Sequence, residues 1–95
     1  MSADQGQETY YSVEMATHVV GLSRTRVRQC LRTGLVQPAT VERGAPLFSE
    51  SELARLRKIR RLTDHLGVNL AGVEIILRLV DELAALRAEA ARAGR

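Results

Sequence analysis

Four arginines lie close together in the segment from Ser23 to Pro38, which reads SRTRVRQCLRTGLVQP. They occupy positions 24, 26, 28 and 32, and the segment contains no Asp or Glu. A guanidinium group can donate paired hydrogen bonds to a phosphate, or to the O6 and N7 atoms of guanine. The segment therefore predicts contact with a polyanion, of which DNA is the leading candidate. A solvated basic surface is the alternative.

Two short helices joined by a tight turn are predicted around these arginines. Ser12 can cap a helix over residues 13–20, which Gly21 stops. Ser23 can cap a second helix over residues 24–33. The apolar positions expected to face the core are Val13, Ala16, Val19 and Val20 in the first helix, and Val27, Leu31 and Cys30 in the second. This order of elements is typical of a helix-turn-helix.

The second helix supplies most of the predicted contacts. In a helix-turn-helix, residues at the start of the second helix reach the base edges in the major groove. Arg24, Thr25 and Arg28 are therefore the best candidates for base contact. Arg26 lies about 200° around the helix from Arg24, so we expect it to contact a phosphate. The full predicted DNA-binding set is Ser23, Arg24, Thr25, Arg26, Arg28, Arg32 and Arg43.

Residues 35–48 predict a small two-stranded wing whose tip lies near Glu42-Arg43-Gly44. Ser49 and Glu52 then form a capping box, which opens a third helix reaching about His65. Its apolar face comprises Leu53, Leu56, Ile59, Leu62 and Leu66. The remaining surface carries Arg55, Arg57, Lys58, Arg60 and Arg61, which are either solvated or in contact with flanking phosphates.

A fourth, longer helix is predicted after Gly67, with Asn69 as its cap. It spans roughly 23 residues, or about 35 Å. A helix of this length extends beyond what a small domain can cover, so we expect its exposed seam to pack antiparallel on a second subunit. The predicted dimer interface is Val73, Ile76, Leu77, Val80, Leu83 and Leu86. The alternative is a helix that folds back on its own domain.

Composition limits the remaining possibilities. The chain has 95 residues, and residues 23–61 hold ten Arg or Lys against three Glu, a net charge of +7 within a total of +3. The predicted organisation is a disordered tail over 1–9, a DNA-binding domain over 10–68 and a dimerisation helix over 69–92. With neither a signal peptide nor an apolar run of about 20 residues, a cytoplasmic, nucleoid-associated protein is expected.

Catalysis and metal binding are not predicted. His18 and His65 are isolated from further ligands, and neither a Gly-rich phosphate loop nor a catalytic carboxylate pair is present. We therefore predict no enzyme, no catalytic or metal site and no cofactor. Cys30 is the single cysteine, which excludes an internal disulfide. A buried structural thiol is the favoured interpretation of Cys30, with a thiol sensor as the alternative.

Most of the chain, from Tyr11 to Leu86, resembles the mercury-resistance-regulator (MerR) family. The motifs are Tyr11-Ser12-Val13, Gly21-Leu22-Ser23, Val27-Arg28, Gly34-Leu35-Val36-x-Pro38, Phe48-Ser49, Leu53-x-x-Leu56-x-x-Ile59-x-x-Leu62 and Leu66-Gly67-Val68-Asn69-Leu70-Ala71-Gly72-Val73. The resemblance implies a mainly α fold: a winged helix-turn-helix of four helices and a two-stranded wing, with a C-terminal dimerisation helix.

Within that resemblance, Arg28 matches an arginine that contacts DNA in the family. Cys30 stands where the family usually has a tyrosine that touches the DNA backbone, and Pro46 stands where an arginine usually precedes the aromatic of the wing. Arg43, at the predicted wing tip, is expected to replace the lost wing charge.

The last motif looks most like two branches of the family, heat-shock repressors and chaperone modulators. The first implies a dimeric, sequence-specific transcriptional regulator that binds a pseudo-palindromic operator. The second implies a protein that binds a J-domain co-chaperone rather than DNA. A DNA-architectural protein is a third possibility.

Overall fold

The structure is a computed structural model, and it describes residues 8–94. Four α-helices, α1 (Val13–Val20), α2 (Arg24–Arg32), α3 (Glu50–Arg60) and α4 (Leu70–Ala93), accompany a hairpin of β1 (Thr40–Glu42) and β2 (Ala45–Leu47). The predicted fold class is therefore confirmed. The chain divides into two compact units, the first ending at Arg61 and the second beginning at Leu62. Most of the predicted tail, residues 1–7, lies outside the described residues.

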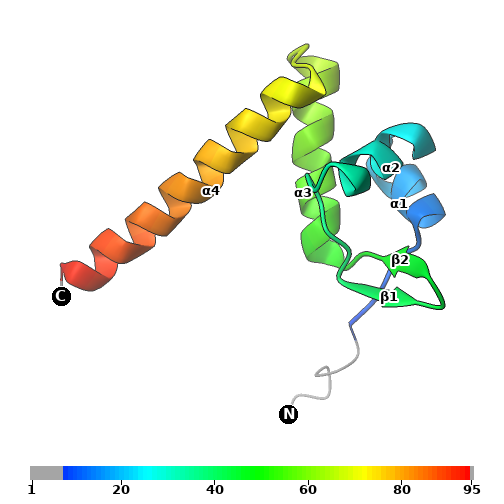
Figure 1. The fold of residues 1–95 in the computed structure, drawn as a ribbon, viewed down its shortest axis with the longest axis horizontal. Helices are drawn as coiled ribbons and strands as arrows, with labels where there is room; N and C mark the ends of the chain where they lie inside the picture. The colour runs from blue at the N-terminus through cyan, green and yellow to red at the C-terminus, as the bar shows by residue number, and fades with distance from the viewer. Residues whose placement is uncertain (1–7, 95) are drawn as a thin grey trace. The chain divides into compact units, whose positions relative to one another are not determined.

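The helix-turn-helix forms where the capping residues indicate. The Ser12 hydroxyl accepts a hydrogen bond from the Met15 N–H at 3.1 Å, and Ser23 does the same for the Arg26 N–H at 3.1 Å. Gly21 ends α1 with a φ of 90°, in the left-handed region that favours glycine. These local bonds fix the tight turn between α1 and α2, which lie together with α3 and the hairpin in Figure 1.

A small aliphatic core joins the first unit. α1 packs on both α2 and α3, and Phe48 is the largest side chain that is fully buried. Two predicted core positions differ from expectation. Val19 is 47% exposed because it lies about 100° around α1 from the buried Val20. Leu31 is half-buried, whereas Val27 and Cys30 are buried.

Two arginines of α3 bind backbone carbonyls within the first unit. The Arg55 Nε–H donates to the Leu35 carbonyl at 2.6 Å, and the Arg60 guanidinium donates to the Val20 carbonyl at 3.3 Å. Arg60 also fills the space beside Gly21, where an added Cβ would lie 3.2 Å from the guanidinium carbon. The expectation that these two residues are simply solvated is therefore wrong, because both are half-buried against the helix-turn-helix.

The wing is tied to the start of α1. In the hairpin, Thr40 pairs with Leu47 and Glu42 with Ala45. Tyr11 adds an antiparallel bridge to Phe48, with N–H to carbonyl distances of 2.7 and 2.8 Å. The Tyr11 hydroxyl then donates to Glu50 at 2.7 Å, and this bond raises the pKa of Tyr11. The bridge was not expected from the sequence, and it fixes the wing relative to α1.

The third helix reaches His65, as predicted, but its last five residues have a different helical geometry. After the capping box, in which the Ser49 N–H donates to Glu52 at 2.6 Å, α3 is regular as far as Arg60. It continues as a π-helical segment, Arg61–His65. The i to i+5 bonding of a π-helix shifts the side chains that follow out of the α-helical phase. Leu66, expected on the apolar face, is consequently 65% exposed.

The second unit is dominated by α4. Its cap is Asn69, whose side chain accepts a hydrogen bond from the Gly72 N–H at 2.8 Å. Val73 and Leu77 are buried in the single chain. The large apolar side chains that α4 exposes are Ile75, Leu79, Val80, Leu83 and Leu86. Most of the length of α4 therefore presents an uncovered apolar surface.

Candidate nucleic-acid interface

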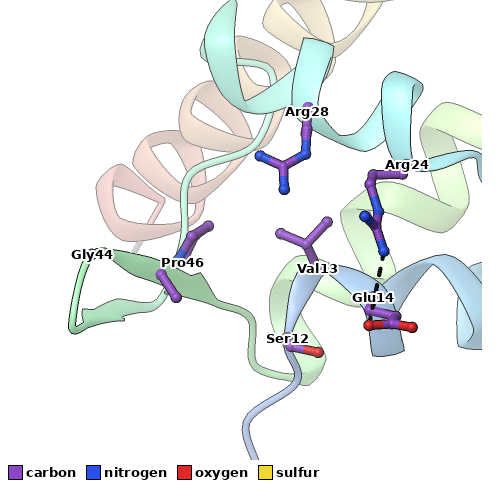
Figure 2. Close-up of a pocket in the computed structure, with 8 residues that line it drawn as sticks. Ser12, Val13, Glu14, Arg24, Arg28, Gly44 and Pro46 are labelled. Carbon is purple, nitrogen blue, oxygen red and sulfur yellow. Dashed lines mark ion pairs between the residues drawn. The ribbon is translucent and has the colours of Figure 1, made fainter.

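Three separate segments of the first unit surround one groove of about 400 Å³. Its lining comprises Ser12, Val13 and Glu14 from the start of α1, Arg24 and Arg28 from α2, and Gly44, Ala45 and Pro46 from the wing. Figure 2 shows these side chains around the open space. The groove exists because the Tyr11–Phe48 bridge holds the wing next to the N-terminus of α1, and because the tight turn brings α2 to the same place.

The two arginines of the groove sit one helical turn apart on the same face of α2. In Figure 2 the guanidinium of Arg28 points from α2 toward Val13 and Pro46. Arg24 points toward Glu14, and its Nη2 lies 3.8 Å from the Glu14 Oε1. Both arginines are exposed, so each can reach a ligand outside the protein. The structure thus brings together two of the predicted base-contacting residues.

The other predicted contact residues do not line this groove. Ser23 caps α2, while Thr25 and Arg32 are exposed. Arg26 is half-buried, and its charge opposes the burial that raises the pKa of the Cys30 thiol. This separation agrees with the helical angle that assigns Arg24 and Arg28 to one face and Arg26 to another.

The wing tip carries Arg43 in an unusual conformation. Arg43 has a φ of 51° and Gly44 a φ of 79°. Positive φ at both central residues of a two-residue hairpin loop defines a type I′ turn, in which Asn-Gly is the preferred pair. An arginine in the left-handed region is conformationally unfavourable. Arg43 is exposed at this position, so its side chain can contact a partner beyond the wing.

Cys30 and Pro46, the two positions that depart from the family pattern, lie in different environments in the fold. Cys30 is fully buried, as the structural interpretation predicts, and burial raises the pKa of its thiol although Arg26 opposes the shift. A residue at this depth cannot touch a DNA backbone. Pro46 is half-buried and lines the groove opposite Arg28. The wing therefore presents an apolar wall where the family usually has a cation.

Glu14 is the member of the site that sequence reasoning missed. Its position in the first turn of a predicted helix is ordinary for an acidic residue. Only the fold places this carboxylate beside the start of α2, so no spacing in the sequence could have indicated the Glu14–Arg24 pair. Within residues 8–94, no cluster of three or more His, Cys, Asp or Glu side chains could hold a metal ion. No helix of the described chain is long and apolar enough to cross a membrane.

A helix-turn-helix whose second helix is rich in arginine, followed by a hairpin wing across a shared groove, defines a winged helix-turn-helix regulator. Residues 11–93 match the sequence model described as "MerR HTH family regulatory protein", and the chain belongs to this family. The family consists of non-enzymatic regulators, which agrees with the prediction that this chain is not an enzyme.

A curated relative extends this comparison. The chain is 33% identical over 81 residues to the "Putative heat shock protein HspR" of Streptomyces coelicolor. The matched region covers 85% of this chain and 54% of the relative, so the chain spans about half of the relative's length. The resemblance to the MerR family, and to its heat-shock branch, is thereby confirmed.

Proposed function

We propose that this protein is a sequence-specific, DNA-binding transcriptional regulator that binds a pseudo-palindromic operator as a homodimer. The observation that carries the proposal is the groove that Arg24 and Arg28 of α2 line together with residues of the wing. A helix and a wing on either side of one open space match the way a winged helix-turn-helix straddles a DNA backbone. In this arrangement, α2 enters the major groove and the wing lies over the flanking phosphates.

Individual arginines take different roles in this complex. Arg28, on the face of α2 that borders the groove, makes the principal base contact, with guanine as its preferred partner. Arg24 and Thr25 contribute to base recognition at the start of α2. Arg26, Arg32 and the wing-tip Arg43 bind phosphates, which fix the register of the protein without reading sequence.

The exposed apolar seam of α4 supports a homodimer. Leu79, Leu83 and Leu86 are each about half exposed or more in the single chain. Together with Ile76 they follow the alternating three- and four-residue spacing of a coiled-coil seam. Two of the predicted interface residues, Val73 and Leu77, are already buried, so the proposed interface uses Ile76, Leu79, Val80, Leu83 and Leu86. A dimer would read two half-sites about one helical turn of DNA apart.

The relative's name supports the biological setting. A heat shock protein of Streptomyces coelicolor shares 33% identity with this chain. We accordingly propose repression of stress-responsive genes as the regulatory role, exercised at the nucleoid in the cytoplasm.

A second candidate function rests on the two departures from the family pattern. Cys30 is buried and Pro46 is apolar, so two usual DNA contacts are absent. A chaperone-modulator-like protein would use the exposed seam of α4 to bind a J-domain co-chaperone instead. The arginines that face the groove favour DNA, because a modulator has no use for them. A purified J-domain co-chaperone that bound stoichiometrically, with no DNA binding at low salt, would favour the modulator.

The decisive experiment is a mobility-shift titration with Arg28→Ala. We expect this change to weaken binding to the preferred duplex by about 1–3 kcal/mol, because a bidentate base contact is lost. Preference at the contacted base pair should relax as well. Arg78→Ala removes an exposed arginine of the second unit and is the matched control. Equal affinity of wild type and Arg28→Ala would show that α2 is not the recognition helix.

A further inference from the structure

The groove contains an acidic residue in a place where a DNA-binding surface ordinarily favours cations. Glu14 projects from the first turn of α1, and its carboxylate lies 3.8 Å from the guanidinium of Arg24 on α2. Both side chains line the groove, and both are largely exposed, Arg24 at 59% and Glu14 at 69%. Figure 2 shows the pair beside Arg28, on the side of the groove that faces away from Pro46.

The position of Glu14 has a simpler explanation that covers only part of the observation. An acidic residue in the first turn of a helix interacts favourably with the helix dipole, and Glu14 occupies that turn of α1. The dipole does not require the carboxylate to face a second helix. The ion pair with Arg24 crosses from α1 to α2, into the surface proposed to contact DNA.

A phosphate that binds Arg24 competes with the Glu14 carboxylate for the charge of the same guanidinium. A phosphate that enters the groove also meets the Glu14 carboxylate, whose like charge repels it. Non-specific binding depends almost entirely on phosphate contacts, so it bears this cost in full. A bidentate contact of an arginine to guanine involves no negatively charged partner, and a carboxylate behind the guanidinium helps to hold it in one orientation.

We infer that Glu14 is a specificity-determining residue that acts through Arg24, by withholding this arginine from DNA phosphates and orienting it for base contact. The inference rests on the proposed DNA-binding function and deepens it. It assigns to the carboxylate a role in discrimination between operator and random DNA, in addition to its place in the first turn of α1.

The test is a double-mutant cycle with Glu14→Gln, Arg24→Gln and the double variant. Each protein is titrated, over a salt series, with a random-sequence duplex and with the best duplex selected from a randomised pool. We expect Glu14→Gln to bind the random duplex about 1.4- to 5-fold more tightly, which is the range for an exposed ion pair of about 0.2–1 kcal/mol. The salt slope should steepen by about one, because a released Arg24 neutralises one further phosphate.

For the selected duplex, the affinity of Glu14→Gln should change by less than it does for the random duplex, so the specificity ratio falls. In the Arg24→Gln background, Glu14→Gln should have no effect on either duplex. Glu74→Gln removes an equal charge from the exposed surface of α4 and controls for net charge. Thermal unfolding of each variant verifies that α1 keeps its fold.

Two results would overturn the inference while DNA binding stands. One is an unchanged affinity of Glu14→Gln for the random duplex. The other is an equal gain in the presence and absence of Arg24, which would mean that the carboxylate repels DNA through space and does not act on Arg24. Failure of the wild type to bind either duplex at low salt would instead refute the DNA-binding proposal, and this inference with it.

Discussion

At the scale of single residues, the site is defined by how its arginines are held. Arg28 faces an apolar part of the groove formed by Val13 and Pro46, whereas Arg24 faces a carboxylate. Arg43 occupies a backbone conformation that its side chain does not favour. Residues held in unfavourable φ/ψ regions are concentrated at functional sites. The three arginines therefore differ in environment, and each should respond differently to substitution.

Arg43→Asn should stabilise the protein and weaken its binding to DNA. Asparagine adopts the left-handed region more easily than arginine, so we expect the free energy of unfolding to rise by roughly 1 kcal/mol. Loss of one phosphate contact should lower the affinity for random and selected duplexes alike and reduce the salt slope by about one. Urea denaturation and salt-dependent mobility shifts measure the two effects.

Arg43→Lys is the matched control for this change, because it keeps the charge and the unfavourable backbone. It should leave stability and the salt slope close to those of the wild type. DNA binding by Arg43→Asn that equals the wild type at every salt concentration would show that the wing tip does not contact DNA.

At the scale of elements, α3 is a support for the helix-turn-helix. Arg55 donates a hydrogen bond to the carbonyl of Leu35, which follows α2, and Arg60 donates one to the carbonyl of Val20, the last residue of α1. Arg57 and Lys58 remain exposed. A run of five basic residues on one helix thus contains both structural and solvent-facing members, and only the contacts of the folded chain separate them.

Arg55→Met should destabilise the first unit without affecting DNA recognition directly. The change leaves the carbonyl of the buried Leu35 without the charged donor that now lies at 2.6 Å. Loss of a hydrogen bond to a charged group costs about 1.5–3 kcal/mol. Urea denaturation should show this loss for Arg55→Met and little change for the exposed Arg57→Met. Equal stability of the two variants would contradict the structural role of Arg55.

Most elements could be predicted from the sequence because their ends are determined locally. Ser12, Ser23 and Asn69 cap the helices that follow them, and Gly44 permits the wing turn at the expected place. Each of these signals acts within three residues along the chain. The π-helical segment and the Tyr11–Phe48 bridge were not predicted, because the first has no capping signature and the second joins residues that are distant in sequence.

At the scale of the whole molecule, α4 determines whether the proposed regulator can form a dimer. Its apolar residues divide into a buried group, Val73 and Leu77, and an exposed group that includes Leu79. The interface predicted from the sequence includes members of both groups and omits Leu79. Periodicity alone could not separate them, because both groups have helical spacing and only tertiary packing decides which one is covered.

Leu83→Asp should dissociate the proposed dimer. The side chain is 47% exposed in the single chain, and a symmetric interface would lose two buried leucines at once. We expect dimerisation to weaken by roughly 3 kcal/mol or more, given about 1.5–3 kcal/mol for each leucine. Sedimentation velocity measures the change, and DNA binding should then require higher protein concentrations.

Ala88→Asp is the matched control, since this exposed position lies about 140° around α4 from Leu83. It introduces the same charge into the same helix and should leave the dimer intact. A wild-type protein that sedimented as a monomer at all concentrations would refute the dimer, and equal effects of the two substitutions would place the interface elsewhere.

The sequence by itself determined the order of the elements, the concentration of positive charge in residues 23–61 and the arginines of α2. These features follow from helical periodicity, capping residues and turn residues, all of which act over a few positions. Only the tertiary structure decided which side chains share the groove, that Glu14 faces Arg24, and that two basic residues of α3 are structural. Such contacts join segments that are remote along the chain, and they depend on packing distances that no local pattern encodes.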